Sequence, residues 1–291
     1  MTTQHTNRCA GMRDWLPQDM ARFRRVEDAF RKASAQRGYQ EVRTPTLEYL
    51  YFFTSAGRLT PEKLRNVYSF LDLDGWSGER VVLRPDGTIP IARLFSEHPD
   101  WSGQQRFCYV ENTFSFSREG DQPRERWQCG AEFIGVASPQ GDVELVQLGL
   151  ETLSLLGLDA EVRLFHAGLA RALSEQKDGV ADLFQTGGKA AGFLKNLRPQ
   201  MQRRLPKAVA SLDHLASLAE ALDKQAVRYH IDALQTHDFE YYTGAMFSFV
   251  VQGKLVGSGG RYDDLVSKMG GAAVPASGFA LYVEPLVELL A

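Results

Sequence analysis

The chain has 291 residues and a mass of 32.5 kDa, which corresponds to about two domains or to one large domain with an insertion. Hydrophobic residues make up 44% of the chain and charged residues 24%, a globular composition that excludes a mainly disordered protein or a fibre. The net charge is −3, so the protein can bind nucleic acid only through a local basic patch.

Cysteine usage and hydropathy narrow the class of protein further. Cys9, Cys108 and Cys129 are scattered and form no C-x-x-C pair, so they support neither a disulfide framework nor a zinc site. No apolar run approaches the roughly 18 residues that span a membrane, and residues 1–8 lack the apolar region of a secretory signal. We therefore expect a soluble protein of the cytoplasm, with no contact with a membrane.

Residues 1–167 alternate between helical and strand patterns, with turn signals between them. In chain order we predict a helix over residues 19–37, a strand over 41–45, a hairpin over 67–73 and 80–83 with its turn at Asp74-Gly75, a helix over 89–95, two strands over 106–116 and 127–134, a helix over 142–156 and a strand over 160–165. Hairpin connections of this kind favour an antiparallel sheet over parallel winding.

The composition changes after residue 167. Residues 168–229 are rich in Ala, Leu, Lys and Arg and predict several short helices, while strand patterns return at 239–251 and 254–256 and a final helix begins near Glu284. We therefore expect an α+β fold, in which an antiparallel sheet is flanked by helices and carries a helical insertion. The expected division is a core of residues 1–167, an insertion of residues 168–229 and a second part of the core over residues 230–291.

Two polar motifs near predicted strands are candidate parts of a binding site. Asp86 and Thr88 follow a strand, where they either cap the helix that begins at Ile89 or face a ligand that carries an amine. Gln128 and Glu132 are four residues apart on one strand, so both point to the same face. That face is either solvated or part of a pocket, because buried polar groups need partners.

Aromatic and glycine residues gather at two predicted strand ends, in Tyr241-Tyr242-Thr243-Gly244 and in Gly259-Gly260-Arg261-Tyr262-Asp263. Glycines permit close backbone approach, but such a cluster is also typical of a bulge or a turn. The glycine cluster at residues 257–260 matches neither the dinucleotide fingerprint nor the P-loop.

A basic run over residues 195–207 consists of Lys195, Arg198, Arg203, Arg204 and Lys207. It is a solvated helical face, a contact for an anionic protein, or an RNA-binding patch. The last of these is the least favoured, because the run lacks interleaved aromatic residues.

Taken in order, the motifs resemble those of histidyl-tRNA synthetase, a class II aminoacyl-tRNA synthetase. The segments that carry the resemblance are Gly11 to Pro17, the strand at Pro45, Leu83 to Thr88, Phe107 to Gly135, Tyr241 to Gly244 and Gly259 to Asp263. The resemblance runs from about Gly11 to the last residue. It implies the antiparallel sheet of that family, flanked by helices, with a helical insertion before the Tyr-Tyr segment.

The same resemblance implies that the ATP-binding machinery of the synthetases is lost. Ser115 stands where the family has the arginine that grips the α-phosphate, with Arg118 three residues farther on, and Arg126 replaces the aromatic that stacks on adenine. His237 replaces the arginine that catalyses adenylate formation, and Pro285 replaces the one that clamps the γ-phosphate. Adenylate formation needs placed cations, so we expect no catalytic residue, no cofactor and no metal.

The amino-acid pocket is retained, by the same resemblance. Its candidate histidine-binding residues are Asp86, Thr88, Gln128, Glu132, Tyr241, Tyr242 and Tyr262. In this pocket Glu132 would hold an imidazole N–H, while Asp86, shortened from the family's usual glutamate, would pair with an ammonium group. The sequence stops within the last family motif, before the anticodon-binding domain of the synthetases, so we expect no such domain and no reading of tRNA.

This combination is similar to the regulatory subunits of ATP phosphoribosyltransferase, a family of synthetase paralogues in histidine biosynthesis. It implies a non-catalytic chain that joins a short-form catalytic subunit in a hetero-oligomer, activates it and confers feedback inhibition by histidine. It also implies a homodimer formed near Pro45. An active histidine–tRNA ligase and a free-standing paralogue that binds RNA or an amino acid remain alternatives. The docking surface, and whether histidine binds in the pocket or between chains, stay open.

Overall fold

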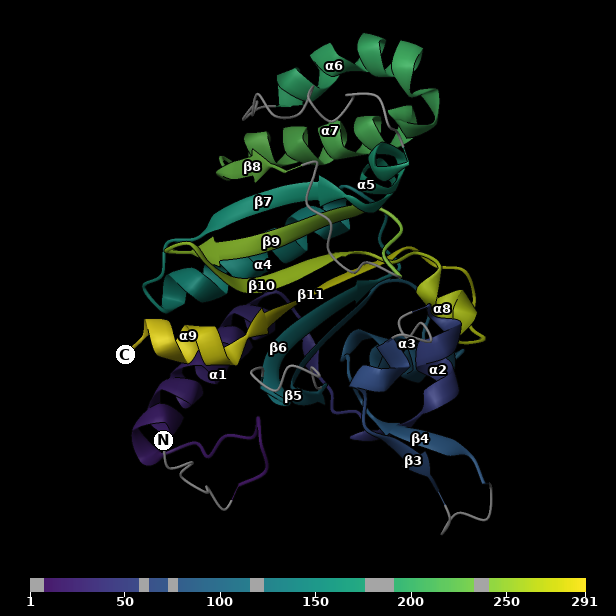
Figure 1. Cartoon of the computed structure of the whole chain (residues 1–291). Coiled ribbons are helices and arrows are strands. Elements are labelled where there is room, and N and C mark those ends of the chain that lie inside the picture. The colour runs from purple at the N-terminus through teal and green to yellow at the C-terminus, as the bar shows by residue number, and fades with distance from the viewer. Residues whose placement is uncertain (1–7, 58–62, 73–77, 116–122, 176–190, 233–240) are drawn as a thin grey trace, which may run out of the picture.

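The computed structural model describes residues 8–57, 63–72, 78–115, 123–175, 191–232 and 241–291. In these ranges helices surround one large sheet and one small one, which confirms the predicted α+β fold (Figure 1). None of the helices in these ranges is long and apolar enough to cross a membrane.

The large sheet has eight strands in the order β1-β5-β6-β11-β10-β9-β7-β8. The strands are β1 (Gln40–Glu41), β5 (Gln105–Phe114), β6 (Glu125–Ile134), β7 (Glu161–His166), β8 (Tyr229–Ile231), β9 (Ala245–Val251), β10 (Lys254–Arg261) and β11 (Ala276–Tyr282). The six strands from β5 to β7 in this order pair antiparallel, as predicted. The short strands β1 and β8 pair in parallel at the two edges.

A small sheet lies beside the large one in the order β2-β4-β3. Its strands are β2 (Leu47–Tyr49), β3 (Ser69–Leu71) and β4 (Arg80–Leu83), accompanied by α2 (Leu50–Ser55), η1 (Lys63–Asn66) and α3 (Thr88–Ser96). The antiparallel pair β3–β4 confirms the predicted hairpin, whose turn at Asp74-Gly75 lies outside the described residues.

Helices pack on both faces of the large sheet. On one face α1 (Pro17–Gln36), α4 (Gln140–Leu155) and α9 (Val283–Leu289) cover the side of β6 that carries Cys129, Ala131 and Phe133. The opposite face packs on α3 and α8 (Leu265–Lys268), and it carries Tyr109, Ile134 and Tyr262. The alternation predicted for the strand of Gln128 and Glu132 is therefore confirmed, since successive side chains of β6 enter different clusters.

Several helices lie between β7 and β8, and we call them the helical segment. They are α5 (Ala167–Ser174), α6 (Ala191–Arg204), η3 (Pro206–Ala208) and α7 (Val209–Lys224). Figure 1 shows α6 stacked on α7, which in turn lies against β7 and β8. Buried leucines of α7 join the core of the large sheet, so this packing depends on apolar burial.

The structure corrects two predicted strands. The strand expected over residues 41–45 is shortened to β1, because Thr44 turns to bond the carboxylate of Glu111 through both its backbone N–H and its hydroxyl. The glycine cluster at residues 257–260 lies inside β10 and forms no turn. A Cβ at Gly259 would collide with the backbone of β11, so glycine is needed for these two strands to approach.

Candidate functional site

A buried carboxyl group forms the centre of the candidate site. Glu132 on β6 is 0% exposed, and its Oε1 accepts hydrogen bonds from the hydroxyls of Thr88, at 2.8 Å, and Tyr109, at 3.2 Å. Its Oε2 accepts one from the hydroxyl of Tyr262. Among the described residues only these hydroxyl groups bond the carboxyl. Burial raises the pKa of Glu132 to about 8, although the hydroxyl groups act in the opposite direction.

Glycines on the neighbouring strands make room for this arrangement. A Cβ at Gly278, which lies opposite Glu132 on β11, would collide with Oε2 of that carboxyl. A Cβ at Gly130 would collide with the ring of Tyr109, which lies opposite it on β5. The side chains of Tyr109 and Glu132 therefore cross the sheet surface in space that only glycine leaves free.

A second carboxyl group, that of Asp86, lies beside the first. Its Oδ1 accepts from the backbone N–H of Ile89 at 2.9 Å, so the predicted cap at the start of α3 is confirmed. Its Oδ2 accepts from the hydroxyl of Tyr241 at 2.9 Å, and the Tyr241 ring packs edge-on against Tyr262. The charge of Asp86 contributes to the raised pKa of Glu132, so each carboxyl lies in the electrostatic field of the other.

The remaining predicted residues, Tyr242 and Gln128, lie at different distances from this cluster. The ring of Tyr242 stacks at a tilt on that of Tyr241, with 4.8 Å between centroids, and also packs on Met246. Gln128 shares the face of Glu132 but lies about 13 Å farther along β6. No hydrogen bond joins its side chain to the cluster among the described residues. The structure thus brings together all of the predicted residues except Gln128.

Tyr109 belongs to the cluster but was not among the residues predicted for it from the sequence. Its hydroxyl bonds Glu132 from the neighbouring strand, in register with Gly130. A glycine inside a strand, between Gln128 and Glu132 on one face, was the available signal, since it marks a close approach by another group. That signal does not say which strand supplies the group.

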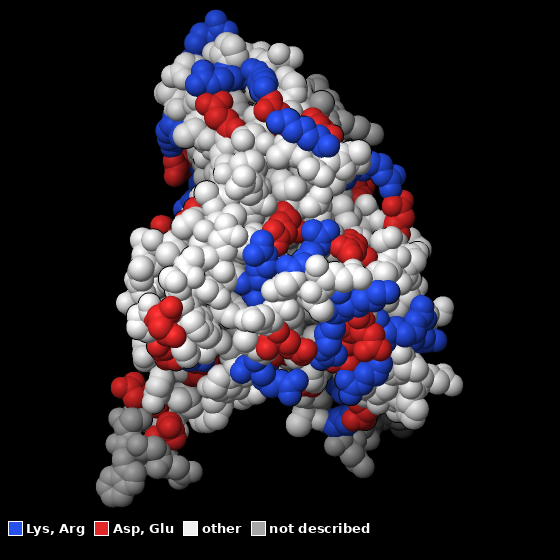
Figure 2. All heavy atoms as spheres, turned by 180° about the vertical axis from the view of Figure 1, so that it is seen from behind, with Lys and Arg blue, Asp and Glu red and all other residues white. Residues whose placement is uncertain are grey.

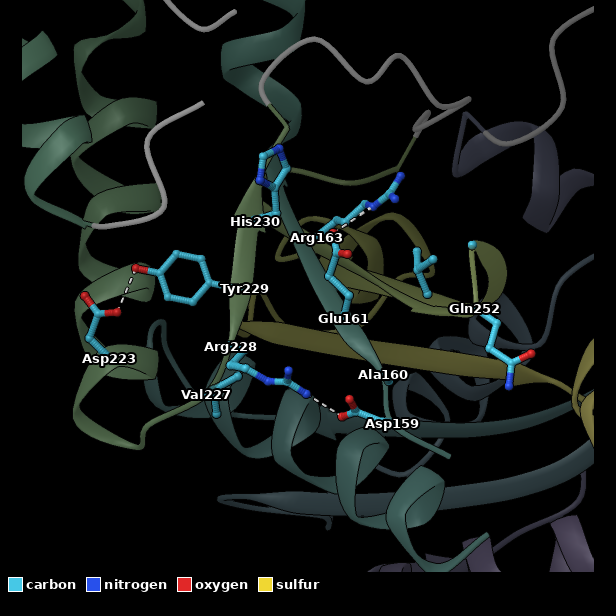
Figure 3. A pocket seen from close by; sticks show the side chains of 12 residues that line it. Asp159, Ala160, Glu161, Arg163, Asp223, Val227, Arg228, Tyr229, His230 and Gln252 are labelled. Carbon is cyan, nitrogen blue, oxygen red and sulfur yellow. Dashed lines mark hydrogen bonds and ion pairs between the residues drawn. The ribbon is translucent and has the colours of Figure 1, made fainter. Parts of the chain in front are cut away.

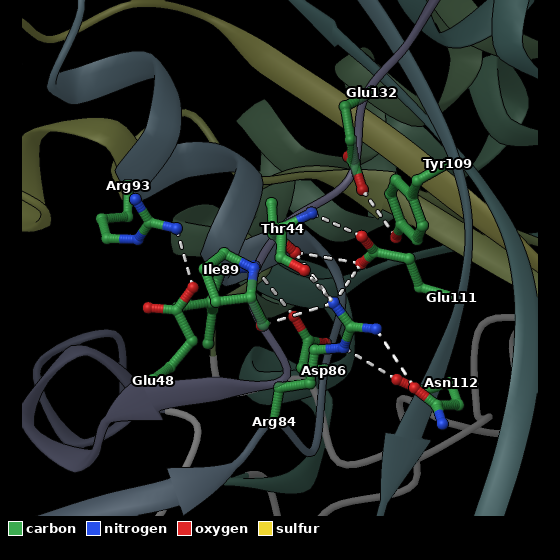
Figure 4. A network of polar contacts seen from close by, with 11 residues as sticks. Thr44, Glu48, Arg84, Asp86, Ile89, Arg93, Tyr109, Glu111, Asn112 and Glu132 are labelled. Atoms are coloured by element: carbon green, nitrogen blue, oxygen red, sulfur yellow. Dashed lines mark hydrogen bonds and ion pairs between the residues drawn. The ribbon is translucent and has the colours of Figure 1, made fainter.

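A buried ionic network supports the turn that carries Asp86 (Figure 4). The guanidinium of Arg84 lies 2.6 Å from the Glu111 carboxylate and donates to the backbone carbonyls of Thr44 and Asn112, at 2.9 and 2.8 Å. These contacts join β4, β5 and the segment before Pro45. The guanidinium of Arg84 is therefore bonded to groups of this chain and has a structural role.

The positions at which the synthetases carry phosphate-binding arginines hold uncharged residues where the structure describes them. Ser115 follows β5, and its backbone N–H bonds the carbonyl of Arg124. Pro285 is the third residue of α9, next to Glu284, whose carboxylate accepts from the backbone N–H of Trp127 at 2.9 Å. His237, at the third of these positions, and Arg118, three residues beyond Ser115, lie outside the described residues.

The basic run on α6 and η3 is largely neutralised by the helical segment itself. Three of its residues form ion pairs, which are Lys195–Glu220, Arg198–Asp213 and Lys207–Glu175. Figure 2 shows the same interleaving of basic and acidic side chains over the rear face of the molecule. This pattern favours the solvated helical face over an RNA-binding patch.

A hollow of about 750 Å³ lies at the far end of the large sheet, between the starts of β7 and β8 and the β9–β10 turn (Figure 3). Its charged side chains pair with one another, as in Arg228–Asp159 at 2.5 Å and Arg163–Glu161 at 3.3 Å. The described residues contain no group of three His, Cys, Asp or Glu side chains that could hold a metal ion. The hollow is separate from the Glu132 cluster and shares no residue with it.

Comparison with known proteins supports the resemblance found in the sequence. A family model described as histidyl-tRNA synthetase matches residues 11–185 and 174–286. A crystal structure of an ATP phosphoribosyltransferase regulatory subunit/histidyl-tRNA synthetase from Bacillus halodurans superposes with a TM-score of 0.84 and 25% identity, covering 100% of this chain and 84% of that one. The fold is therefore that of a class II synthetase-like protein.

Curated relatives refine this assignment. An ATP phosphoribosyltransferase regulatory subunit from Dehalococcoides mccartyi strain BAV1 is 44% identical over 97% of this chain and 77% of its own length. A histidine–tRNA ligase from Caldicellulosiruptor saccharolyticus is 32% identical over 96% of this chain and 73% of its own length. The chain belongs to the histidyl-tRNA synthetase family and, within it, to the ATP phosphoribosyltransferase regulatory subunits.

Proposed function

We propose that this chain is a non-catalytic subunit that activates a short-form ATP phosphoribosyltransferase catalytic subunit and makes it sensitive to histidine. The observation that carries the proposal is the buried Glu132 carboxyl, which is surrounded by the hydroxyls of Thr88, Tyr109 and Tyr262 and lies next to Asp86. The two partners form a hetero-oligomer in the cytoplasm, at the first step of histidine biosynthesis.

The chemistry of the cluster suits histidine as the effector. With a pKa of about 8, the Glu132 carboxyl is mostly protonated at pH 7 in the chain alone. When it ionises it accepts hydrogen bonds only, and the three hydroxyls leave it without a cationic partner among the described residues. An imidazole N–H supplies a donor, and an imidazolium also supplies the missing charge. Asp86, bonded to Tyr241, offers a second carboxylate for an ammonium group.

The proposal that the chain is non-catalytic rests on the positions that would stabilise a reacting triphosphate. Ser115 and Pro285 carry no charge, and the guanidinium groups of Arg84 and Arg261 are held in buried ion pairs with Glu111 and Asp142. Loss of one donor to a developing negative charge commonly costs about 3 kcal/mol of transition-state stabilisation. A pocket that keeps its amino-acid contacts without these cations is suited to sensing.

We also propose that two copies of this chain pair within the assembly. The small sheet and α2 carry exposed apolar side chains on one side, which we call the apolar face: Leu47, Tyr49, Tyr51 and Phe70. A two-fold axis through this face would bury the same residues of both copies against one another. The face adjoins the segment before Pro45, where the sequence predicts the dimer contact.

The test is to mix the purified chain with a short-form catalytic subunit and measure phosphoribosyl transfer to ATP. We expect turnover to rise by about tenfold, and L-histidine to reverse that rise. An unchanged rate at every mixing ratio would contradict the proposal.

The ligase alternative is favoured by the relatives named histidine–tRNA ligase and is tested with the chain alone. Histidine-dependent exchange of pyrophosphate into ATP would establish it. The proposal predicts no exchange above the background that is measured without protein.

A further inference from the structure

Two histidines meet where the helical segment joins the large sheet. His166 is the last residue of β7, and His214 lies on α7. Nε2 of His166 lies 3.0 Å from Nδ1 of His214, and the two rings pack edge to face with 5.1 Å between centroids. This contact links the helical segment directly to the sheet.

The hydrogen bonds of His166 determine where the protons lie on both rings. Its Nδ1 accepts from the backbone N–H of Gly168 at 3.1 Å, so the ring proton is on Nε2, which donates to Nδ1 of His214. Burial lowers the pKa of both imidazoles, that of His166 to about 3, so both are neutral at pH 7. His214 must therefore carry its own proton on Nε2.

Among the residues that the structure describes, that proton has no acceptor. Nε2 of His214 is buried and has no hydrogen-bond partner within the described ranges. Buried donors without acceptors are rare in folded proteins. Asp142 and Asp263 both act electrostatically on this ring, but both carboxylates bond the guanidinium of Arg261.

The chain segment that carries Tyr241 passes beside this pair. The carbonyl of Gly244 accepts from the backbone N–H of Ala167 at 3.1 Å, and a Cβ at Gly244 would lie only 3.1 Å from Cε1 of His214. At the other end of the segment the hydroxyl of Tyr241 bonds Asp86 in the candidate pocket. Only two residues separate these ends, which makes the segment a short covalent path between the candidate pocket and the histidine pair.

We propose that the His166–His214 contact is the joint through which ligand occupancy of the Glu132 cluster changes the packing of the helical segment. His214 is then a positioning residue for residues 241–244, and it has no contact with the ligand. The inference rests on the proposed function, because it takes L-histidine as the ligand of the pocket. A ligand that moves Tyr241 moves Gly244 against His214, and the packing of α7 on the sheet responds.

The experiment measures hydrogen exchange of the α7 amides, residues 209–224, in the full chain with and without L-histidine. His214→Asn keeps an acceptor where Nδ1 stands, whereas His214→Phe keeps a ring but removes the acceptor. Ser217→Ala, at an exposed position of the same helix, is the matched control. We expect L-histidine to slow α7 exchange about tenfold in the wild type and in Ser217→Ala. The effect should be less than about twofold in His214→Phe, which lacks the acceptor for His166, and in His214→Asn, which lacks the ring atom that Gly244 approaches.

Calorimetric titration of the same samples with L-histidine separates two kinds of failure. If the wild type binds no histidine, the pocket assignment is wrong, and the role proposed for the His166–His214 contact is wrong as well. If histidine binds but α7 exchange is unchanged, or if His214→Phe responds like the wild type, the joint alone is overturned. Should His214→Phe not fold, Gly244→Ala replaces it, because the added methyl group would press on His214 and Arg261.

Discussion

The environment of Glu132 determines what this side chain can do. A carboxyl that is buried among hydroxyl groups favours its protonated form, which is why its pKa rises to about 8 from a reference value of 4.5. The folded state therefore binds a proton more tightly than the unfolded chain. The contribution of Glu132 to stability is present in full below pH 4.5 and is lost as the pH rises through 8.

Glu132→Gln tests this linkage, because glutamine stays neutral at every pH. We expect the free energy of unfolding of the wild type, relative to that of Glu132→Gln, to fall by about 2–4 kcal/mol between pH 5 and pH 8. Urea denaturation at several pH values measures the difference.

A control variant and a second measurement accompany this prediction. Glu161→Gln on β7, where the carboxyl is half exposed, should show no such trend. A difference between the wild type and Glu132→Gln that stays constant with pH would show that the carboxyl is ionised in the folded state. Loss of histidine sensitivity in Glu132→Ala is the matching functional result, and unchanged sensitivity would place the effector elsewhere.

At the scale of elements, the pairing of β5 with β6 builds the site. Gly130 lies opposite Tyr109, and the tyrosine ring occupies the space that a side chain at residue 130 would fill. The exchange of this glycine for alanine changes little in the sequence pattern. It forces a buried ring to move, however, and buried rings in packed cores have little freedom to do so.

Gly130→Ala should therefore destabilise the fold by about 1–3 kcal/mol and weaken histidine binding, because the Tyr109 hydroxyl is moved away from Glu132. Gly192→Ala is the control, since a Cβ at this position on α6 meets nothing within 4 Å. It should be neutral or slightly stabilising. Thermal unfolding and calorimetry check both variants, and equal behaviour of the two would contradict the role given to Gly130.

The sequence predicted those features that depend on local patterns. The helices α1 and α4 and the face of Glu132 follow from periodicity, and the cap formed by Asp86 follows from turn chemistry. The contact between Tyr109 and Glu132 depends on the register of two strands, which no local pattern contains. The bond from Tyr241 to Asp86 joins residues 155 positions apart, and only the family resemblance had assigned both residues to one pocket.

At the scale of the whole molecule, the apolar face is the surface that stays exposed to solvent in a single chain. Phe70 and Tyr49 lie on the outer side of the small sheet, at 46% and 40% exposed, with Leu47 on the same side. Contiguous apolar surface of this kind is typical of contacts between proteins.

Phe70→Glu should shift the chain from dimer to monomer, because each copy would place a charge in an apolar contact. Sedimentation velocity measures the change. Leu155→Glu, at a similarly exposed leucine on α4, is the control and should leave the dimer intact. A dimer that persists in Phe70→Glu, or a wild-type chain that is monomeric at all concentrations, would contradict the proposed pairing.

The two short strands at the margins of the large sheet have a consequence for how complexes grow. β1 spans two residues and β8 three, so neither offers a long row of backbone groups to a strand of another molecule. A strand of another molecule could therefore form few backbone hydrogen bonds with β1 or β8 themselves. At these two strands, contacts between subunits would depend on side chains, which limits growth by the addition of strand to strand.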